Sequence, residues 1–298
     1  MSNFALIGAG GYIAPRHLKA IKETGNNLIA ALDLNDSVGI MDSYFPDADF
    51  FTEPERFDRH LDKLRRQGNQ KIDYVSICSP NYLHDAHMRM ALRNDAHAIC
   101  EKPLVLNPWN LDALQEIEQE TGKKIYTILQ LRLHPAIQKL KKQIEEGPKD
   151  KVYNVNLTYI TSRGKWYFIS WKGDKHKSGG VATNIGVHFF DMLGWIFGDF
   201  KGVELDINKP EKAGGKLYFE KANVNWFLSV DEKDLPNEAI SAKKRTYRNI
   251  NIEGEELEFS DGFTDLHTVS YKDILSGGGY GLEDTRKSIQ IVSSLRNF

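Results

Sequence analysis

The chain has 298 residues, of which 41% are hydrophobic and 27% are charged, and its formal net charge is −2. This composition is typical of a soluble globular protein of about two domains, and the near-neutral charge gives no electrostatic footprint for nucleic acid or an acidic membrane surface. The two cysteines, Cys78 and Cys100, lie in apolar runs, which indicates buried thiols rather than a disulfide framework. We therefore expect a cytoplasmic protein with a small-molecule partner and no bound metal, nucleic acid or membrane.

The first apolar run ends in a glycine turn, Gly8-Ala9-Gly10-Gly11, and a helix-patterned segment follows from Pro15. This order is typical of a dinucleotide-phosphate site, because glycine lets the backbone approach a pyrophosphate and the helix N-terminus supplies N–H donors. The third glycine of the usual fingerprint is Ile13 here, so the turn alone also fits an ordinary strand-to-helix connection.

A second apolar run ends in Asp33. A carboxylate at the end of the second strand can accept hydrogen bonds from both adenosine ribose hydroxyls, and its charge would repel a 2′-phosphate. The competing interpretation is an aspartate that caps a helix after a buried strand. Together with the glycine turn, Asp33 favours NAD over NADP.

Apolar runs alternate with amphipathic segments through the first 130 residues, and one of the helical segments is Pro108–Glu120. The predicted strands are Asn3–Gly8, Asn27–Asp33, Ala48–Thr52, Ile72–Cys78, His97–Glu101 and Lys124–Gln130. This alternation predicts an α/β Rossmann domain with a doubly wound parallel sheet over residues 1–130.

The pattern changes after Val152 to period-two runs, which predict a mostly antiparallel sheet. These runs are Tyr153–Ile160, Lys216–Phe219 and Val224–Val230. We expect residues 131–298 to form a second, α+β domain with a large open sheet that binds substrate. A sheet face left uncovered by helices is commonly buried in a symmetric oligomer, so we also expect at least a dimer.

Chemistry in an open α/β sheet collects at the carboxyl ends of the strands. Ser79-Pro80-Asn81, with His84 close behind, follows the fourth predicted strand, and Glu101-Lys102-Pro103 follows the fifth. Partial desolvation there could lower the pKa of the Lys102 ammonium toward the range of proton transfer, whereas the alternative is a solvated lysine in a turn.

A further polar stripe lies in a glycine-flanked apolar segment, where Asn184, His188 and Asp191 have the spacing of one helix face. The alternative interpretation is a buried histidine bonded to Asp191.

Taken in order, these motifs resemble the Gfo/Idh/MocA family of oxidoreductases, which act on sugars and cyclitols with NAD(P). The resemblance covers almost the whole chain and implies that Lys102 and His188 flank the reacting carbon, with Asn184 beside them. Many members have aspartate where this chain has Asn184; an amide can orient a sugar hydroxyl but cannot accept its proton. The resemblance implies cofactor contacts at Gly8, Gly10, Gly11, Tyr12, Ile13, Asp33, Asn35, Ser79, Asn81, His84, Glu101, Lys102 and Gln130.

A narrower similarity, to the UDP-N-acetylglucosaminuronate 3-dehydrogenases, rests on Gln130–Pro135, Arg163–Tyr167, Ser170–Gly173 and Asn184–Asp191. Such enzymes oxidise the C3 hydroxyl of a UDP-linked amino-sugar acid, in the biosynthesis of surface polysaccharide such as lipopolysaccharide. The cations and aromatic rings of Arg163–Tyr167 and Ser170–Gly173 suit a substrate with a carboxylate, a pyrophosphate and a uracil. The alternative interpretation of these two ranges is a charged loop between strands. The expected substrate contacts are Arg163, Tyr167, Trp171, Lys172, Asn184 and His188.

The expected reaction is hydride transfer from sugar to NAD while Lys102 or His188 takes the hydroxyl proton, and the sequence leaves open which of the two is the base. It also leaves open how NADH is recycled. Three other functions compete: another sugar or inositol dehydrogenase of this family, a non-catalytic sensor of NAD and sugar, and a lyase or isomerase that uses bound NAD transiently. A homotetramer is expected by resemblance.

Overall fold

The computed structural model describes residues 1–68, 70–257 and 265–298. The chain forms two compact units, Met1–Gln130 with Thr264–Thr285, and Leu131–Phe263 with Arg286–Phe298. The sequence predicted contiguous domains, 1–130 and 131–298, whereas the structure returns a late segment to the first unit. The reason is packing: Tyr271 of that segment is fully buried in the same core as Phe4.

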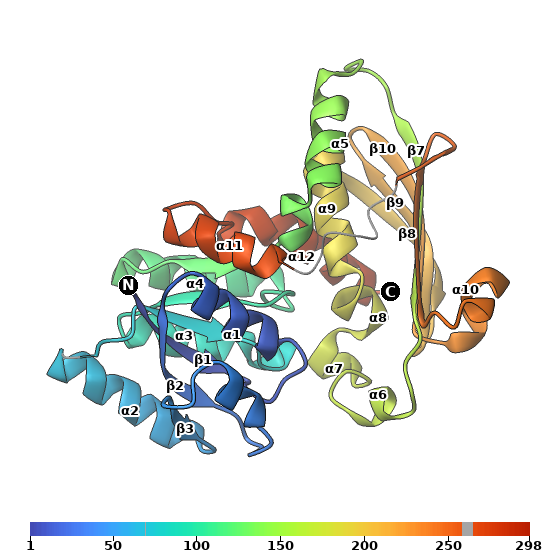
Figure 1. Cartoon of the computed structure of the whole chain (residues 1–298). Helices are drawn as coiled ribbons and strands as arrows, with labels where there is room; N and C mark the ends of the chain where they lie inside the picture. Colours follow the sequence, from blue (N-terminus) through green and yellow to red (C-terminus); the bar gives the residue numbers. More distant parts are fainter. Residues whose placement is uncertain (69, 258–264) are drawn as a thin grey trace. The chain divides into compact units, whose positions relative to one another are not determined.

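The first unit is a doubly wound parallel sheet in the order β3-β2-β1-β4-β5-β6, which confirms the predicted fold class (Figure 1). The strands are β1 (Asn3–Ile7), β2 (Asn27–Leu32), β3 (Asp49–Phe51), β4 (Tyr74–Ile77), β5 (His97–Cys100) and β6 (Ile125–Thr127). The strand order reverses between β1 and β4, and ligands of open α/β sheets bind outside the carboxyl ends of the strands at such a point.

Helices from both ends of the chain cover this sheet. They are α1 (Ala14–Glu23), α2 (Pro54–Gln67), α3 (His84–Arg93), α4 (Pro108–Thr121) and α11 (Leu266–Leu275), with 3₁₀ turns at Gly39–Ser43 and Asn81–Leu83. Helix α11 packs on α1, where Lys19 pairs with Asp265 at 2.7 Å and the Thr268 hydroxyl donates to Glu23 at 2.8 Å. The late segment therefore forms part of the helical layer of the first unit.

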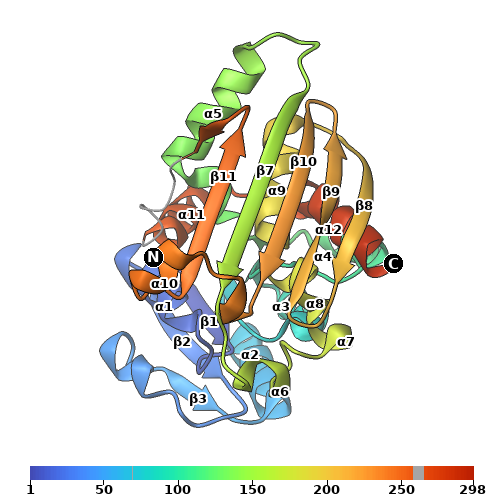
Figure 2. The same cartoon turned by 90° about the vertical axis from the view of Figure 1, so that its right-hand side faces the viewer.

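The second unit is a mostly antiparallel sheet in the order β12-β11-β7-β10-β9-β8, with one parallel pair, β7 and β10 (Figure 2). The strands are β7 (Tyr153–Thr161), β8 (Phe200–Asn208), β9 (Lys212–Phe219), β10 (Ala222–Ser229), β11 (Thr246–Ile252) and β12 (Glu255–Glu256). Along β7, Val155 and Leu157 are buried while Asn154 and Asn156 are exposed, as expected for a sheet covered on one face.

Helices pack against the apolar face of this sheet (Figure 2). On the opposite face, Leu235 and Ala239 pack against Ile160 near one end, and exposed polar side chains such as Asn223 and Asn225 lie elsewhere. The helical segments are η3 (Gln130–Leu133), α5 (Pro135–Glu146), α6 (Trp166–Ile169), α7 (Lys175–Ser178), α8 (Gly180–Asn184), α9 (Val187–Phe197), η4 (Glu232–Asp234), α10 (Asn237–Ser241) and α12 (Leu282–Arg296). Among the described residues, no helix combines the length and apolar character needed to cross a bilayer.

Candidate active site

The glycine turn between β1 and α1 packs directly against the chain that leaves β4. Gly8 has a φ of +90°, and a Cβ there would lie 2.7 Å from the carbonyl carbon of Cys78. Both the backbone conformation and the close approach therefore require glycine. The turn leads into α1, whose N-cap residue is Ile13, while the Tyr12 side chain is 86% exposed.

Asp33 lies at the end of β2 and faces this turn. One carboxylate oxygen accepts the Gly10 N–H and the other accepts the Asn35 N–H, both at 2.9 Å. The helix-cap interpretation is wrong, because the next helical turn begins only at Gly39. Each oxygen retains a lone pair for another donor, which fits a ribose diol.

A compact network joins the segments that follow β4 and β5. The His84 ring is fully buried, with Nδ1 at 2.8 Å from the Pro103 carbonyl oxygen and Nε2 at 2.9 Å from the Ser79 carbonyl oxygen. The Ser79 hydroxyl lies 2.8 Å from Nδ1 of His87, and Asn81 is buried in the same segment. His84 therefore braces the two strand ends, and burial lowers its pKa.

Lys102 stands at the end of β5, half-buried, and its peptide bond to Pro103 is cis. Its main-chain N–H donates to Oε2 of Glu101 at 3.3 Å. Gln130 is 9% exposed, and its Oε1 atom is buried without a hydrogen-bond partner in the described part of the chain. The glycine turn, the Asp33 acceptors and this spare acceptor fit a dinucleotide, so the first unit offers the donors and acceptors that NAD requires.

In the second unit, the predicted single helix through Asn184, His188 and Asp191 is wrong. Asn184 ends α8, whereas the other two residues belong to α9. The N–H of Gly186 bonds to the carbonyl of Val181, five residues back, so the regular helical ladder is interrupted at this point. A Cβ at Gly186 would lie 2.3 Å from the Ala182 carbonyl oxygen, so this bend also depends on glycine.

Asn184 and Tyr167 form a hydrogen-bonded pair in which the amide donates to the phenol oxygen at 3.2 Å. Tyr167 is only 2% exposed, and burial raises its pKa. His188 is half-buried one turn before Asp191. Asp191 receives two hydrogen bonds from Arg132, at 2.9 and 2.7 Å, and this buried ion pair ties α9 to the start of the unit.

The expected basic and aromatic segment lies partly at the surface and contains the short helices α6 and α7. Lys172 lies with its Nζ atom 4.3 Å from the ring centroid of Trp171, a cation–π contact. Burial, and then the charge of Arg163, lower the pKa of Lys172. Arg163 itself is exposed, so this segment presents two cations and an indole ring.

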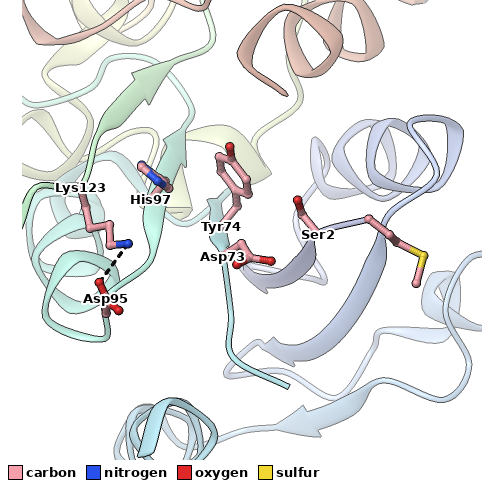
Figure 3. Close-up of a pocket in the computed structure, with 7 residues that line it drawn as sticks. Ser2, Asp73, Tyr74, Asp95, His97 and Lys123 are labelled. Atoms are coloured by element: carbon pink, nitrogen blue, oxygen red, sulfur yellow. Dashed lines mark ion pairs between the residues drawn. The ribbon is translucent and has the colours of Figure 1, made fainter. Parts of the chain in front are cut away.

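A polar cavity of about 360 Å³ lies at the other edge of the parallel sheet, near the amino ends of β4 and β5 (Figure 3). Lys123 pairs there with Asp95 at 2.9 Å, and His97 stacks on Tyr74. The remaining lining residues are Met1, Ser2 and Asp73. Because ligands of this fold bind at the carboxyl ends of the strands, we do not assign this cavity to the cofactor.

Sequence reasoning missed a buried cluster beside Lys102, in which His17 and His267 both contact Glu101. His17 is a lone histidine in an apolar stripe of α1, and His267 lies far away in the sequence. No local spacing links them, so only the packing of α11 on α1 could show the cluster.

Two family models match the chain in sequence order. An oxidoreductase-family model, described as an NAD-binding Rossmann fold, matches residues 2–128, and the model of the same family's C-terminal alpha/beta domain matches residues 141–228. The chain belongs to the Gfo/Idh/MocA oxidoreductase family. Its first unit is accordingly the NAD-binding Rossmann fold of that family.

Solved structures of this family extend the likeness over the whole chain. The WlbA (WbpB) dehydrogenase of Thermus thermophilus, in complex with NAD and alpha-ketoglutarate, is 51% identical with a TM-score of 0.96, covering 100% of this chain and 96% of that one. The same dehydrogenase in complex with NAD and UDP-GlcNAcA gives 50% identity, a TM-score of 0.96 and coverage of 100% and 95%. The WlbA dehydrogenase of Bordetella pertussis, at 20% identity and a TM-score of 0.79 over 99% and 94% of the two chains, shares the fold.

The first curated relatives have lower sequence identity than the Thermus thermophilus dehydrogenase, and each matches less than half of this chain. The putative oxidoreductase YteT of Bacillus subtilis is 27% identical over 49% of this chain, and the match spans 34% of its own length. The first curated relatives are thus matched over about a third of their length.

Proposed function

We propose that this protein is an NAD-dependent dehydrogenase that oxidises the C3 hydroxyl of UDP-N-acetylglucosaminuronate to a ketone. The observation that carries this proposal is the full-length likeness, at half of all positions, to a dehydrogenase solved with NAD and UDP-GlcNAcA. The chain's own residues suit such a ligand pair. The first unit offers a glycine turn and Asp33 for the cofactor, and the second offers cations and an indole ring for a substrate with two anionic groups.

In the proposed reaction, bound NAD takes the hydride from C3. Lys102 or His188 removes the hydroxyl proton while the other donates a hydrogen bond to the same oxygen. The Asn184 side chain orients a sugar hydroxyl, and its bond to Tyr167 fixes the direction in which the amide points. Arg163 and Lys172 pair with the carboxylate and the pyrophosphate, and Trp171 stacks on the sugar or the uracil.

The test is incubation of the purified protein with NAD and a panel of UDP-sugars and free sugars, with nicotinamide absorbance and substrate mass followed together. Without another oxidant, we expect UDP-N-acetylglucosaminuronate to lose two hydrogens while NAD is reduced to NADH. With a 2-oxo acid as a second oxidant, the sugar should still lose two hydrogens, and any hydride that NADH passes on should appear as the reduced 2-hydroxy acid. Oxidation of only free sugars or inositols would overturn the substrate. Without the 2-oxo acid, a changed substrate that has lost no hydrogens, with no net nicotinamide reduction, would indicate a lyase or isomerase, and binding without any conversion would indicate a sensor.

Lys102→Met tests the catalytic assignment. We expect turnover to fall by about a hundredfold or more, the scale of general acid–base catalysis, while NAD binding is retained. The matched control is Lys63→Met, which removes an exposed lysine of α2. Near-normal turnover of the Lys102 variant would contradict the assignment.

Three further properties belong to the same proposal: a homotetramer, a cytoplasmic location and a role in making surface polysaccharide such as lipopolysaccharide. The face of the second sheet that is covered by α10 at one end and otherwise carries exposed side chains supports an assembly, because such a face is commonly buried between subunits (Figure 2). Light scattering at micromolar concentration tests it, and a monomer there would refute the tetramer.

A further inference from the structure

The buried cluster beside Lys102 has one carboxylate at its centre. Oε1 of Glu101 lies 3.0 Å from Nε2 of His17, on α1, and 2.9 Å from Nε2 of His267, on α11. The three residues are 7%, 0% and 1% exposed, and all belong to the first unit. A buried carboxylate is costly unless donors satisfy it, and here two imidazoles from opposite ends of the chain do so.

The surrounding hydrogen bonds fix the proton positions. The Tyr271 hydroxyl lies 2.7 Å from Nδ1 of His17 and 2.6 Å from the Ser76 hydroxyl. If His17 carries its proton on Nε2, serine donates to tyrosine, tyrosine to Nδ1 of His17, and Nε2 of His17 to Glu101, so every proton has an acceptor. In the described residues, Nδ1 of His267 is buried without a partner. A proton there would be an unsatisfied buried donor, so His267 also carries its proton on Nε2.

The charges around the cluster agree with this assignment. Burial alone would raise the pKa of Glu101, but the donors His17 and His267 outweigh it and hold that pKa well below its usual range. Burial lowers the pKa of His17, and its hydrogen bond to Glu101 only partly offsets this effect. The neighbouring thiols of Cys78 and Cys100 and the phenol of Tyr271 have raised pKa values and stay neutral. Glu101 is therefore a carboxylate that accepts the Nε2–H groups of both histidines.

This arrangement determines what the second oxygen of Glu101 can do. With Oε1 engaged by both histidines, Oε2 is directed at the main-chain N–H of Lys102, 3.3 Å away. The same carboxylate thus connects α1 and α11 to the residue at the end of β5.

We propose that His17 and His267 are positioning residues for Lys102: by holding one oxygen of Glu101, they direct the other to the Lys102 main chain and fix the strand end that carries the lysine. The proposal rests on the proposed function in so far as Lys102 acts in the reaction. The same three ligand atoms also lie within 4.8 Å of one another, the spacing of a metal site. Two ordinary N–H···O distances to one oxygen favour hydrogen bonds, and metal binding is an outcome of the test.

The first experiment does not depend on activity. In the ¹⁵N-labelled protein between pH 6 and 8, both histidines should show the tautomer with the proton on Nε2, and added zinc should leave their ring signals unchanged. A ring that carries its proton on Nδ1 alone, or zinc-shifted signals, would overturn the proposal.

The second experiment measures amide hydrogen exchange and kinetics in His267→Leu and His267→Gln. Leucine removes the donor, whereas the glutamine NH₂ can replace Nε2–H. We expect exchange of the Lys102 amide to speed up at least about tenfold in the leucine variant and to recover in the glutamine variant. The value of kcat should fall about tenfold or more with leucine, with KM for the sugar changed by less than about threefold, and should recover with glutamine.

His60→Gln, on α2, is the control for a histidine outside the cluster. Unchanged Lys102 exchange in His267→Leu, or equal losses in both variants, would refute the positioning role. If the leucine variant fails to fold, the tautomers and the glutamine variant still decide the question. If the wild-type protein oxidises no UDP-sugar, the proposed function fails while the tautomer and exchange measurements still test the positioning role.

Discussion

We expect replacement of Asp33 to change the preference for NAD over NADP. The structure allows the effect of its charge to be separated from the effect of its hydrogen bonds. Its carboxylate lies at the end of β2 and is held by two main-chain donors, Gly10 and Asn35. A 2′-phosphate on the adenosine ribose would bring its negative charge to about 5 Å from this group. At effective dielectric constants between about 80 and about 20, each unit charge then costs about 0.8 to about 3 kcal/mol. We therefore expect wild-type protein to bind NAD at least about tenfold more tightly than NADP, a difference of about 1.4 kcal/mol.

Two substitutions distinguish the contributions. Asp33→Asn removes the charge but keeps one acceptor oxygen, so it should mainly relieve the penalty against NADP. Asp33→Ala also removes the bonds to Gly10 and Asn35, so it should narrow the preference mainly by weakening NAD. Asp36→Asn, an exposed acidic residue three positions later, is the matched control and should leave both affinities unchanged.

Titration calorimetry with both cofactors on all four proteins measures these effects. Equal affinities of the wild-type protein for NAD and NADP would mean that the carboxylate does not face the ribose. An alanine variant that binds NAD as tightly as wild type would contradict the proposed hydrogen bonds, even if the preference for NAD survived.

Two further predictions concern stability. Arg132→Met leaves the buried Asp191 carboxylate without its bidentate partner. The free energy of unfolding, measured in urea, should fall by about 3–5 kcal/mol. The double variant Arg132→Met with Asp191→Leu should recover more than half of that loss, because it leaves no unpaired buried charge. Burial, with a smaller effect from His84, lowers the pKa of His87 from 6.5 to about 4. As the pH falls, the unfolded state therefore takes up this proton before the folded state does. The free energy of unfolding should drop by about 3 kcal/mol between pH 6.5 and about pH 4. His87→Asn keeps a partner for Ser79 and should flatten the decline; an unchanged slope in its urea titrations would refute the assignment.

The sequence predicted the parallel sheet well because its strands are continuous apolar runs joined by helices of ordinary length. Each run such as β1 is buried on both faces, so its hydrophobicity alone reveals it. The strands β8, β11 and β12 were not predicted, and β8 and β12 are the two edges of the second sheet. Along β8, the exposed residues Lys201, Glu204 and Asp206 interrupt the apolar pattern, and no residue of this strand is fully buried.

The candidate site was predictable where the chemistry follows a strand end, as at Asp33 and Lys102. It was not predictable where the backbone departs from a regular period. The spacing of Asn184 and His188 is helical in the sequence, yet the close approach at Gly186 breaks the helix between them. A glycine inside an apolar helix pattern is compatible with either outcome, and only the packed structure selects one.

The buried cluster shows why a first domain that ends at residue 130 would lack part of its own core. A fragment that ends at Gln130 would keep His17 and Glu101 but lose His267 and Tyr271. Glu101 would then have one imidazole donor, and Nδ1 of His17 would lose its tyrosine partner. The same cut would uncover the apolar side chains of α1 that pack beneath α11, at a cost of about 25 cal/mol for each Å² of apolar surface exposed. The NAD-binding unit therefore depends on the late segment both for its core and for the carboxylate that borders its proposed catalytic lysine.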